Sequence, residues 1–360
     1  GGEKMKKIIK AFCFLLISFC TLLMSAVVYG FYTLPDDIYT LDAGDIDVGF
    51  YSCSFSGIEN VNQSKTVSSV GEYEVNISLF NKIPVKISRL TVSDRRYVVP
   101  SGDIIGLRMF TKGVMIVATD SVDSQNGSRN PSKTAGLQKG DVLTSIDGVS
   151  IENSAQVEAI VSGCNGRTLS VAYTRNNKAF STDITPSFSQ SEQRYKTGLW
   201  IRDSAAGIGT MTFYEKRSGF FACLGHAVCD VDTGEILPLS DGDIVDAAIS
   251  GCVKGKAGMA GELCGNFRNK SLGTVILNNA CGVFGYLNSS ENSSQELPVA
   301  LKSEIRTGSA QIISTVENDS KEYYDIEIEK LSPDNKDDKN MIIKIKDSRL
   351  IEKTGGIVQG

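Results

Sequence analysis

A long uncharged apolar run near the start of the chain restricts its folding more than any other feature. Residues 11–32 carry no charged side chain and are rich in Leu, Phe, Val and Ile. About 20 such residues span a bilayer as a helix. Four lysines within residues 1–10 precede the run, while Asp36 and Asp37 follow it. The positive-inside rule therefore predicts a cytoplasmic basic tail at 1–10, a transmembrane signal anchor at 11–32 and an extracytoplasmic remainder. A signal peptide cut near Gly30 is the alternative.

Length, charge and cysteine content limit the number of domains and the kinds of partner and metal site that this chain can have. A chain of 360 residues with 41% hydrophobic residues is long enough for two or three domains. The net charge is -5 and no Lys/Arg cluster follows the first ten residues, which excludes nucleic acid as a partner. The nine cysteines show no CxxC pair and no histidine at ligand spacing, so we expect no metal site and no cofactor. Cys223 with Cys229, or Cys252 with Cys264, remain possible disulfides in an oxidising compartment.

The segment 45–99 has the alternating pattern of half-buried strands. Apolar and polar residues alternate through 73–79 and again through 85–90. We therefore predict a small β module that separates the later domains from the membrane.

The next segment, 100–182, carries a more specific pattern at residues 134–148, Thr-Ala-Gly-Leu-Gln-Lys-Gly-Asp-Val-Leu-Thr-Ser-Ile-Asp-Gly. Gly140 predicts a tight turn, a strand follows, and Asp147-Gly148 predicts a hairpin turn. A short helix is expected from Ser154. This run resembles the central signature of a PDZ domain. The resemblance implies that a peptide adds a strand to the sheet edge, with its carboxylate held by a loop formed by Ile104, Ile105, Gly106 and Leu107.

Residues 190–360 show short apolar runs and many glycines, which predict an all-β barrel or sandwich. His226 is the chain's single histidine and follows a glycine at the end of an expected strand. A lone histidine on an apolar run is more often a core residue than a catalytic one. However, the pattern of 209–213 together with 224–230 resembles the peptidase domain of the stage IV sporulation protein B family.

A second motif carries the same resemblance at residues 347–360, Asp-Ser-Arg-Leu-Ile-Glu-Lys-Thr-Gly-Gly-Ile-Val-Gln-Gly. In that family the run continues into Met-Ser-Gly-Ser-Pro, whose first serine is the nucleophile. The resemblance makes His226 the general base and Asp347 the acid that orients it. We therefore expect this sequence to stop before the catalytic serine and to be inactive as it stands.

The resemblance covers anchor, β module, PDZ domain and peptidase domain in that order. It implies a mainly β protein with a chymotrypsin-like double β-barrel, incomplete at its C-terminus, in the space between mother cell and forespore. The implied substrate is a membrane-bound regulator of an intramembrane metalloprotease, whose release activates a late sigma factor, and self-cleavage is a further possibility. One alternative is a PDZ adaptor that binds peptides without cutting them. Another is a quality-control protease, but such proteases place the PDZ domain last.

Overall fold

The computed structural model of the chain describes residues 2–41, 46, 48–55, 70–125, 127–290, 294–317, 320–332 and 340–359. The protein is mainly β, as the sequence predicts. It divides into two compact units. The first comprises 1–97, 298–307 and 331–341, and the second comprises 98–297, 308–330 and 342–360.

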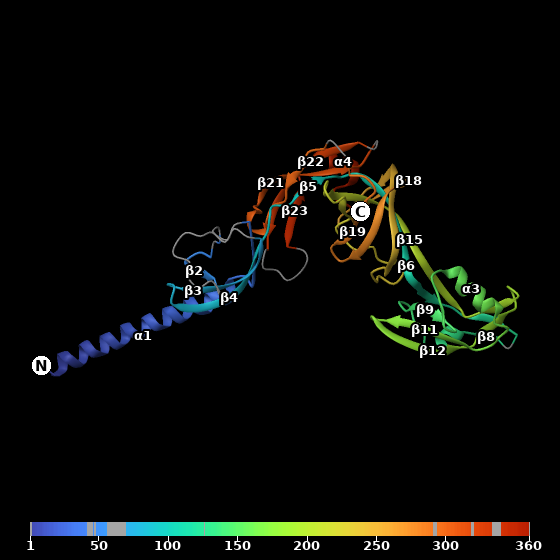
Figure 1. Cartoon of the computed structure of the whole chain (residues 1–360), viewed down its shortest axis with the longest axis horizontal. Coiled ribbons are helices and arrows are strands. Elements are labelled where there is room, and N and C mark those ends of the chain that lie inside the picture. The colour runs from blue at the N-terminus through green and yellow to red at the C-terminus, as the bar shows by residue number, and fades with distance from the viewer. Residues whose placement is uncertain are drawn as a thin grey trace. The chain divides into compact units, whose positions relative to one another are not determined.

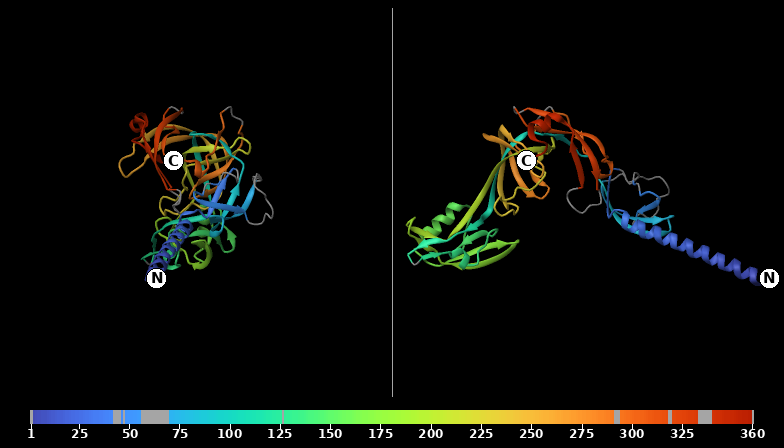
Figure 2. Two further views of the ribbon diagram at one scale, coloured as in Figure 1. Left: turned by 90° about the vertical axis from the view of Figure 1, so that its left-hand side faces the viewer. Right: turned by 180° about the vertical axis from the view of Figure 1, so that it is seen from behind.

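The first unit begins with the helix α1, Gly2–Thr33, which runs without interruption through the basic residues and the apolar run (Figure 2). By length and composition it can cross a membrane. Its C-terminal end packs on the β module that follows. Tyr51 donates a hydrogen bond from its hydroxyl to the Ala26 carbonyl at 2.7 Å, and a Cβ on Gly30 would lie 2.6 Å from the Tyr51 ring. A glycine is therefore needed at this close approach.

The β module is a four-stranded sheet in the order β1-β4-β3-β2. Its strands are β1 (Asp37–Thr40), β2 (Tyr51–Phe55), β3 (Gly71–Leu79) and β4 (Ile83–Val92). Val75, Ile77 and Leu79 alternate with polar residues along β3 and are buried in its core. The strands expected at 73–79 and 85–90 are thus present, whereas residues 56–69 lie outside the described part of the chain.

Two later segments also belong to this first unit, which differs from the contiguous 190–360 domain that the sequence suggests. One begins at Pro298, the second residue of the strand β20 (Leu297–Pro298), and contains the 3-10 helix η2 (Lys302–Glu304). Arg95 forms a bidentate ion pair with Glu304, with distances of 2.7 and 2.6 Å. The guanidinium of Arg95 lowers the pKa of Glu304 to about 2. The returning chain is therefore joined to the module by a pairing that sequence periodicity does not reveal.

The second unit contains a PDZ-like portion whose core is formed by both sheet and helix. Asp147 and Gly148 both have positive φ, as the predicted hairpin turn requires. Its elements are β7 (Val122–Ser124), β8 (Gly127–Arg129), α2 (Pro131–Thr134), β9 (Val142–Ile146), β10 (Val149–Ser150), α3 (Ser154–Gly163), β11 (Leu169–Arg175), β12 (Lys178–Ile184), β13 (Ser187–Ser189) and β14 (Arg194–Lys196). Buried Asp141 pairs with Arg175 at 2.6 Å. Turn, helix and core agree with the sequence prediction for this segment.

Six antiparallel strands close a β-barrel in the same unit. The closed ring is β6-β17-β18-β19-β16-β15, because β15 pairs with β6 as well as with β16. The strands are β6 (Ile104–Thr119), β15 (Leu199–Tyr214), β16 (Phe220–Cys223), β17 (Leu239–Val253), β18 (Gly261–Asn279) and β19 (Gly282–Leu287), and β5 (Tyr97–Pro100) pairs with the end of β15. Figure 1 shows β6 and β15 side by side. Both strands are long enough to belong to the barrel at one end and to the PDZ-like portion at the other.

The remaining strands form a three-stranded sheet of β21 (Gly308–Thr315), β22 (Lys321–Leu331) and β23 (Met341–Ile345). It is followed by α4 (Ser348–Thr354) and by β24 (Val358–Gln359), which pairs in parallel with β18. Among the described residues the strand pairings close a single barrel. The double barrel implied by the family resemblance is therefore not confirmed.

Candidate active site and peptide groove

His226 lies in a loop that leaves the barrel through two residues with unusual backbone geometry. Strand β16 ends at Cys223, and Leu224 and Gly225 follow with φ of 70° and 73°. The Leu224 side chain packs over Gly209 of β15, where a Cβ would lie only 2.4 Å from it. Two left-handed residues in succession turn the chain sharply out of the sheet, so His226 begins the loop rather than continuing the strand.

The imidazole of His226 has one ring nitrogen engaged and the other free. Nδ1 lies 2.9 Å from the carbonyl oxygen of Ala227. Since a carbonyl only accepts, Nδ1 donates this hydrogen bond, and in the neutral imidazole Nε2 then presents its lone pair. Nε2 is buried and has no hydrogen-bond partner. A neutral imidazole with an unpaired, buried Nε2 is the form that a general base requires.

Asp347, the predicted acid of the triad, is not brought to His226. Its carboxylate caps the N-terminus of α4 and accepts hydrogen bonds from Arg349, from both backbone and guanidinium, and from the Asp325 backbone N–H. The Arg349 guanidinium lowers the pKa of Asp347 to about 2. No hydrogen bond joins Asp347 to His226 in the described structure. Here Asp347 stabilises a helix end, because the start of α4 offers it unpaired N–H groups.

Ile104, Ile105, Gly106 and Leu107 do not form the predicted carboxylate-binding loop. They are buried in β6 and pair with β15 on one edge, and Ile105, Gly106 and Leu107 also pair with β17 on the other. A Cβ on Gly106 would lie 2.6 Å from the side chains of Phe267 and Val245, so Gly106 permits barrel packing. The prediction was wrong because an apolar Ile-Ile-Gly-Leu sequence suits a barrel strand as well as a loop, and long-range pairing decides between them.

The groove that suits a peptide lies elsewhere, between α3 and the start of β15. It encloses about 360 Å³. Leu199 and Ile201 pack against the PDZ core, and β6 pairs with one edge of their strand. No described strand pairs with the other edge of 199–203, which faces α3. A strand edge beside a helix is the arrangement by which PDZ domains accept an extended peptide.

Thr197, Gly198 and Leu199 also line the groove, and sequence reasoning missed them. Gly198 has φ of +74°, and a Cβ there would lie 2.1 Å from the Asp120 carbonyl oxygen. The Asp120 N–H donates to the Gly198 carbonyl at 2.7 Å. The sequence carries no signal that singles out Gly198 and Leu199, because a Gly-Leu pair also occurs at 106–107 and at 136–137.

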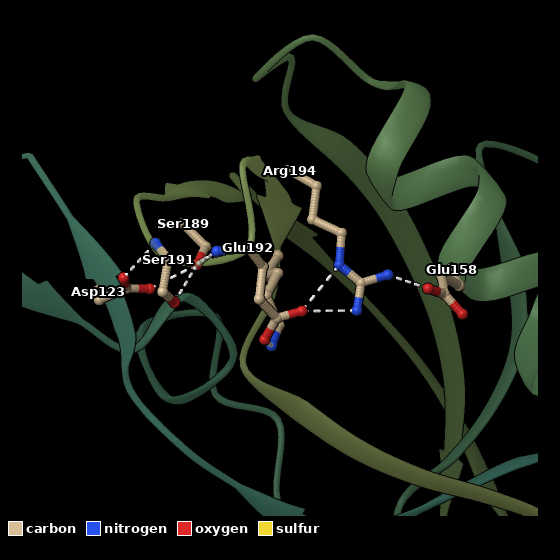
Figure 3. Close-up of polar contacts among 7 residues, drawn as sticks. Asp123, Glu158, Ser189, Ser191, Glu192 and Arg194 are labelled. Atoms are coloured by element: carbon tan, nitrogen blue, oxygen red, sulfur yellow. Dashed lines mark hydrogen bonds and ion pairs between the residues drawn. The ribbon is translucent and has the colours of Figure 1, made fainter.

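The short hairpin of β13 and β14 supplies Arg194, Tyr195 and Lys196 to the groove lining. Figure 3 shows the polar contacts that hold this hairpin. Asp123 of β7 accepts hydrogen bonds from the Ser189 hydroxyl at 2.5 Å and from the Ser191 N–H at 2.7 Å. Arg194 pairs with Glu192 and also with Glu158 of α3. The hairpin is thus attached to the helix that forms the opposite wall, and the groove carries charges of both signs.

The tip of the His226 loop is fastened to β15 by a buried carboxylate. Asp230 is 2% exposed and pairs with Arg202, which also pairs with Asp232 at 2.8 Å. Burial opposes ionisation of Asp230, but hydrogen bonds from Thr233 and the charge of Arg202 outweigh it, so the pKa lies below its ordinary value. Arg202 follows the groove-lining residues 199–201 directly, so one strand serves both the groove and the loop.

The described residues contain no group of His, Cys, Asp and Glu side chains that could hold a metal ion. The nine cysteines are free thiols. Gly251 lies opposite Cys264 in the β17–β18 register, so Cys252 and Cys264 project from opposite faces of the sheet. Burial raises the pKa of Cys223 to about 12, which makes it an inert core thiol.

Two family models match the chain, and their boundaries differ from those of the PDZ-like portion and of the barrel. Residues 193–360 match the family model described as SpoIVB peptidase S55, and residues 104–185 match the PDZ domain model. The groove residues 194–201 therefore lie in the peptidase match and outside the PDZ match.

Two individual proteins show shorter similarities. Over 60 residues the chain is 37% identical to the zinc metalloprotease RasP of Shouchella clausii, covering 17% of this chain and 14% of that protein. The crystal structure of the PDZ domain of the SdrC-like protein from Listeria monocytogenes is similar at 24% identity and a TM-score of 0.21, over 25% of this chain and 87% of that one. Residues 193–360 of this chain are thus similar to the SpoIVB peptidase S55 family, and a PDZ domain match at 104–185 precedes this peptidase segment.

Proposed function

We propose that the protein is a sporulation signalling serine endopeptidase in which His226 acts as the general base. The observation that carries this proposal is the buried, unpartnered Nε2 of His226, with Nδ1 engaged by the Ala227 carbonyl. Nε2 takes the proton of a serine hydroxyl as that hydroxyl attacks the scissile carbonyl, and it later returns the proton to the leaving amine. No described serine reaches Nε2. The family resemblance supplies the nucleophile from the Met-Ser-Gly-Ser-Pro continuation that follows the 347–360 motif.

The substrate in this proposal is a membrane-bound regulator of an intramembrane metalloprotease, with the protein's own chain as a second substrate. An extended peptide in the groove between α3 and β15 brings the substrate to the enzyme. The helix α1 supports membrane attachment, and the lysines in its first turns support an extracytoplasmic location for the rest of the chain, in the space between mother cell and forespore.

The test is proteolysis by the full gene product. We expect cleavage of a membrane-protein substrate and labelling of a serine by a fluorophosphonate, both lost in His226→Ala. Loss of a positioned general base lowers kcat by roughly 10² to 10⁴-fold. Cys229→Ala is the matched control, because Cys229 is exposed in the same loop and its loss leaves a serine mechanism unaffected. Cleavage that survives His226→Ala would contradict the assignment, and loss in Cys229→Ala would indicate a cysteine nucleophile.

A PDZ adaptor without catalysis is the second candidate function, and the groove itself favours it. The groove includes an open strand edge and a facing helix, which are sufficient for peptide binding in the absence of chemistry. Peptide binding by a full gene product that neither cleaves substrates nor reacts with fluorophosphonate would support the adaptor.

A further inference from the structure

The peptide group between Ala227 and Val228 is held between two side chains. Its carbonyl oxygen lies 2.9 Å from His226 Nδ1. Its N–H, on Val228, donates to Asn278 Oδ1, also at 2.9 Å. One peptide plane thus connects the amide of Asn278, at the end of β18, to the imidazole of His226.

The orientation of the Asn278 amide is fixed by its own hydrogen bonds. Nδ2 donates to the carbonyl oxygens of Val228 at 2.9 Å and of Leu237 at 3.0 Å. Oδ1 accepts from Val228, so exchanging the oxygen and nitrogen would place donor against donor and acceptor against acceptor. Val228 and Leu237 are the two sides of the loop base, since the Leu237 N–H donates to the Val228 carbonyl at 3.0 Å. Asn278 therefore closes the base of the loop that begins at His226.

We propose that Asn278 is a positioning residue that sets the tautomer of His226 through the Ala227–Val228 peptide group. By holding the peptide N–H, Asn278 fixes the direction of the Ala227 carbonyl and strengthens it as an acceptor, because hydrogen bonds in a chain polarise one another. The proton is then held on Nδ1 and the Nε2 lone pair is free. This is the task that a triad carboxylate performs, and Asp347 does not perform it in this structure.

The tautomer of His226 can be read directly, because the chain has a single histidine. The full chain is labelled with ¹⁵N-histidine, held in detergent micelles at pH 8, and examined by imidazole ¹H–¹⁵N correlation spectra. We expect the Nδ1–H tautomer, whereas a histidine free in water favours Nε2–H. A wild-type spectrum of the Nε2–H form would overturn the proposal without any variant.

Asn278→Ala removes the amide that accepts from the Val228 N–H and donates to the carbonyls of Val228 and Leu237. We expect its spectrum to shift toward the Nε2–H tautomer in a protein that remains folded by circular dichroism. Asn288→Ala is the matched control, since Asn288 donates to Ser271 at 3.3 Å and has no bond to the loop. Retention of the Nδ1–H tautomer in folded Asn278→Ala would overturn the proposal.

The predicted effect of Asn278→Ala on turnover rests on the proposed peptidase function. The predicted effect on the His226 tautomer does not depend on that function. In the full gene product we expect kcat of Asn278→Ala to fall by up to the roughly 10² to 10⁴-fold contribution of a general base, with KM little changed. A wild type with the Nδ1–H tautomer and no proteolysis would refute the peptidase function and leave the role of Asn278 standing.

Discussion

Among single residues, Leu224 departs furthest from ordinary backbone geometry near the candidate site. Its φ of 70° is uncommon for a bulky residue and costs on the order of 1–3 kcal/mol. Packing of its side chain over Gly209 and the clamp of Asn278 on the loop help to hold this conformation. Strain next to a residue that carries chemistry is typical of functional sites, and it supports the assignment of His226.

Asp347 gives a prediction at the same scale. Its folded-state pKa of about 2 lies below the ordinary aspartate value, so its ion pair with Arg349 stabilises the protein above about pH 4 and is lost as pH falls through 2. We expect Asp347→Asn, which keeps the helix cap, to lower Tm at pH 7 and to approach the wild type as pH falls below 2. Asp241→Asn, an exposed aspartate, is the control. A Tm difference that does not change with pH would contradict this account, and a changed His226 tautomer in Asp347→Asn would favour the triad role.

At the scale of elements, β15 has the most varied role. Its first residues line the groove, Arg202 holds the His226 loop, and Asp203 accepts hydrogen bonds from the N–H and hydroxyl of Ser154 at the start of α3. Since successive side chains on a strand point to opposite faces, Arg202 and Asp203 reach different neighbours. The strand thus connects the helix wall of the groove to the loop of the candidate base.

Removing Arg202 tests this connection. Arg202→Ala leaves the Asp230 carboxylate buried without its cation, which costs about 3 kcal/mol, at the lower end of the range for a broken buried pair because Thr233 still donates to Asp230. Urea unfolding measures the change. Arg108→Ala is the control, since its pair with Asp243 lies at the surface and its loss should therefore destabilise the fold less. Equal losses of unfolding free energy in the two variants would show that the buried Arg202–Asp230 pair stabilises the fold no more than the surface pair does.

Peptide binding gives a second prediction for these elements. Trp200, the chain's single tryptophan, lines the groove and is 60% exposed, so its fluorescence should shift to the blue when a peptide covers it. Peptides selected from a displayed library against the full chain provide the probe. We expect Ser162→Phe, which fills the groove, to weaken binding about tenfold or more. Ala159→Phe, on an exposed face of the same helix, should not change it. If Ser162→Phe and Ala159→Phe changed the peptide affinity equally, the peptide would bind outside this groove.

At the scale of the whole molecule, sequence segments and compact units do not coincide. The PDZ match ends at residue 185, yet its core and groove use residues 194–201. Residues 298–307 and 331–341, within the peptidase match, belong to the first unit. β6 serves both the PDZ-like portion and the barrel, so neither is complete without the other's strands.

This shared construction predicts how fragments behave. A fragment of residues 104–185 lacks the β15 edge, so we expect it not to bind peptides selected on the full chain. A synthetic peptide of residues 193–203 should bind this fragment, because Leu199 and Ile201 complete its core. Isothermal titration calorimetry measures both. Strong binding of the selected peptides by the fragment alone would show that the groove does not need β15.

The sequence by itself determined the features that local chemistry controls. An uncharged apolar run becomes α1, Asp147-Gly148 adopts the positive φ values of a hairpin turn, Ser154 begins α3, and β16 ends just before Leu224-Gly225-His226. Each follows from backbone preferences or periodicity within a few residues.

Tertiary structure alone decided where distant segments meet. The apolar residues 104–107 lie in β6, a barrel strand between β15 and β17. The groove that suits a peptide is lined instead by Gly198 and Leu199. Asp347 caps α4, while the imidazole of His226 contacts the neighbouring Ala227 carbonyl. The N–H of that same peptide group is bound by Asn278, which lies 52 residues beyond His226 in the chain. Strand pairing and side-chain hydrogen bonds across such separations depend on which partners the whole fold brings within reach, and no local pattern records that choice.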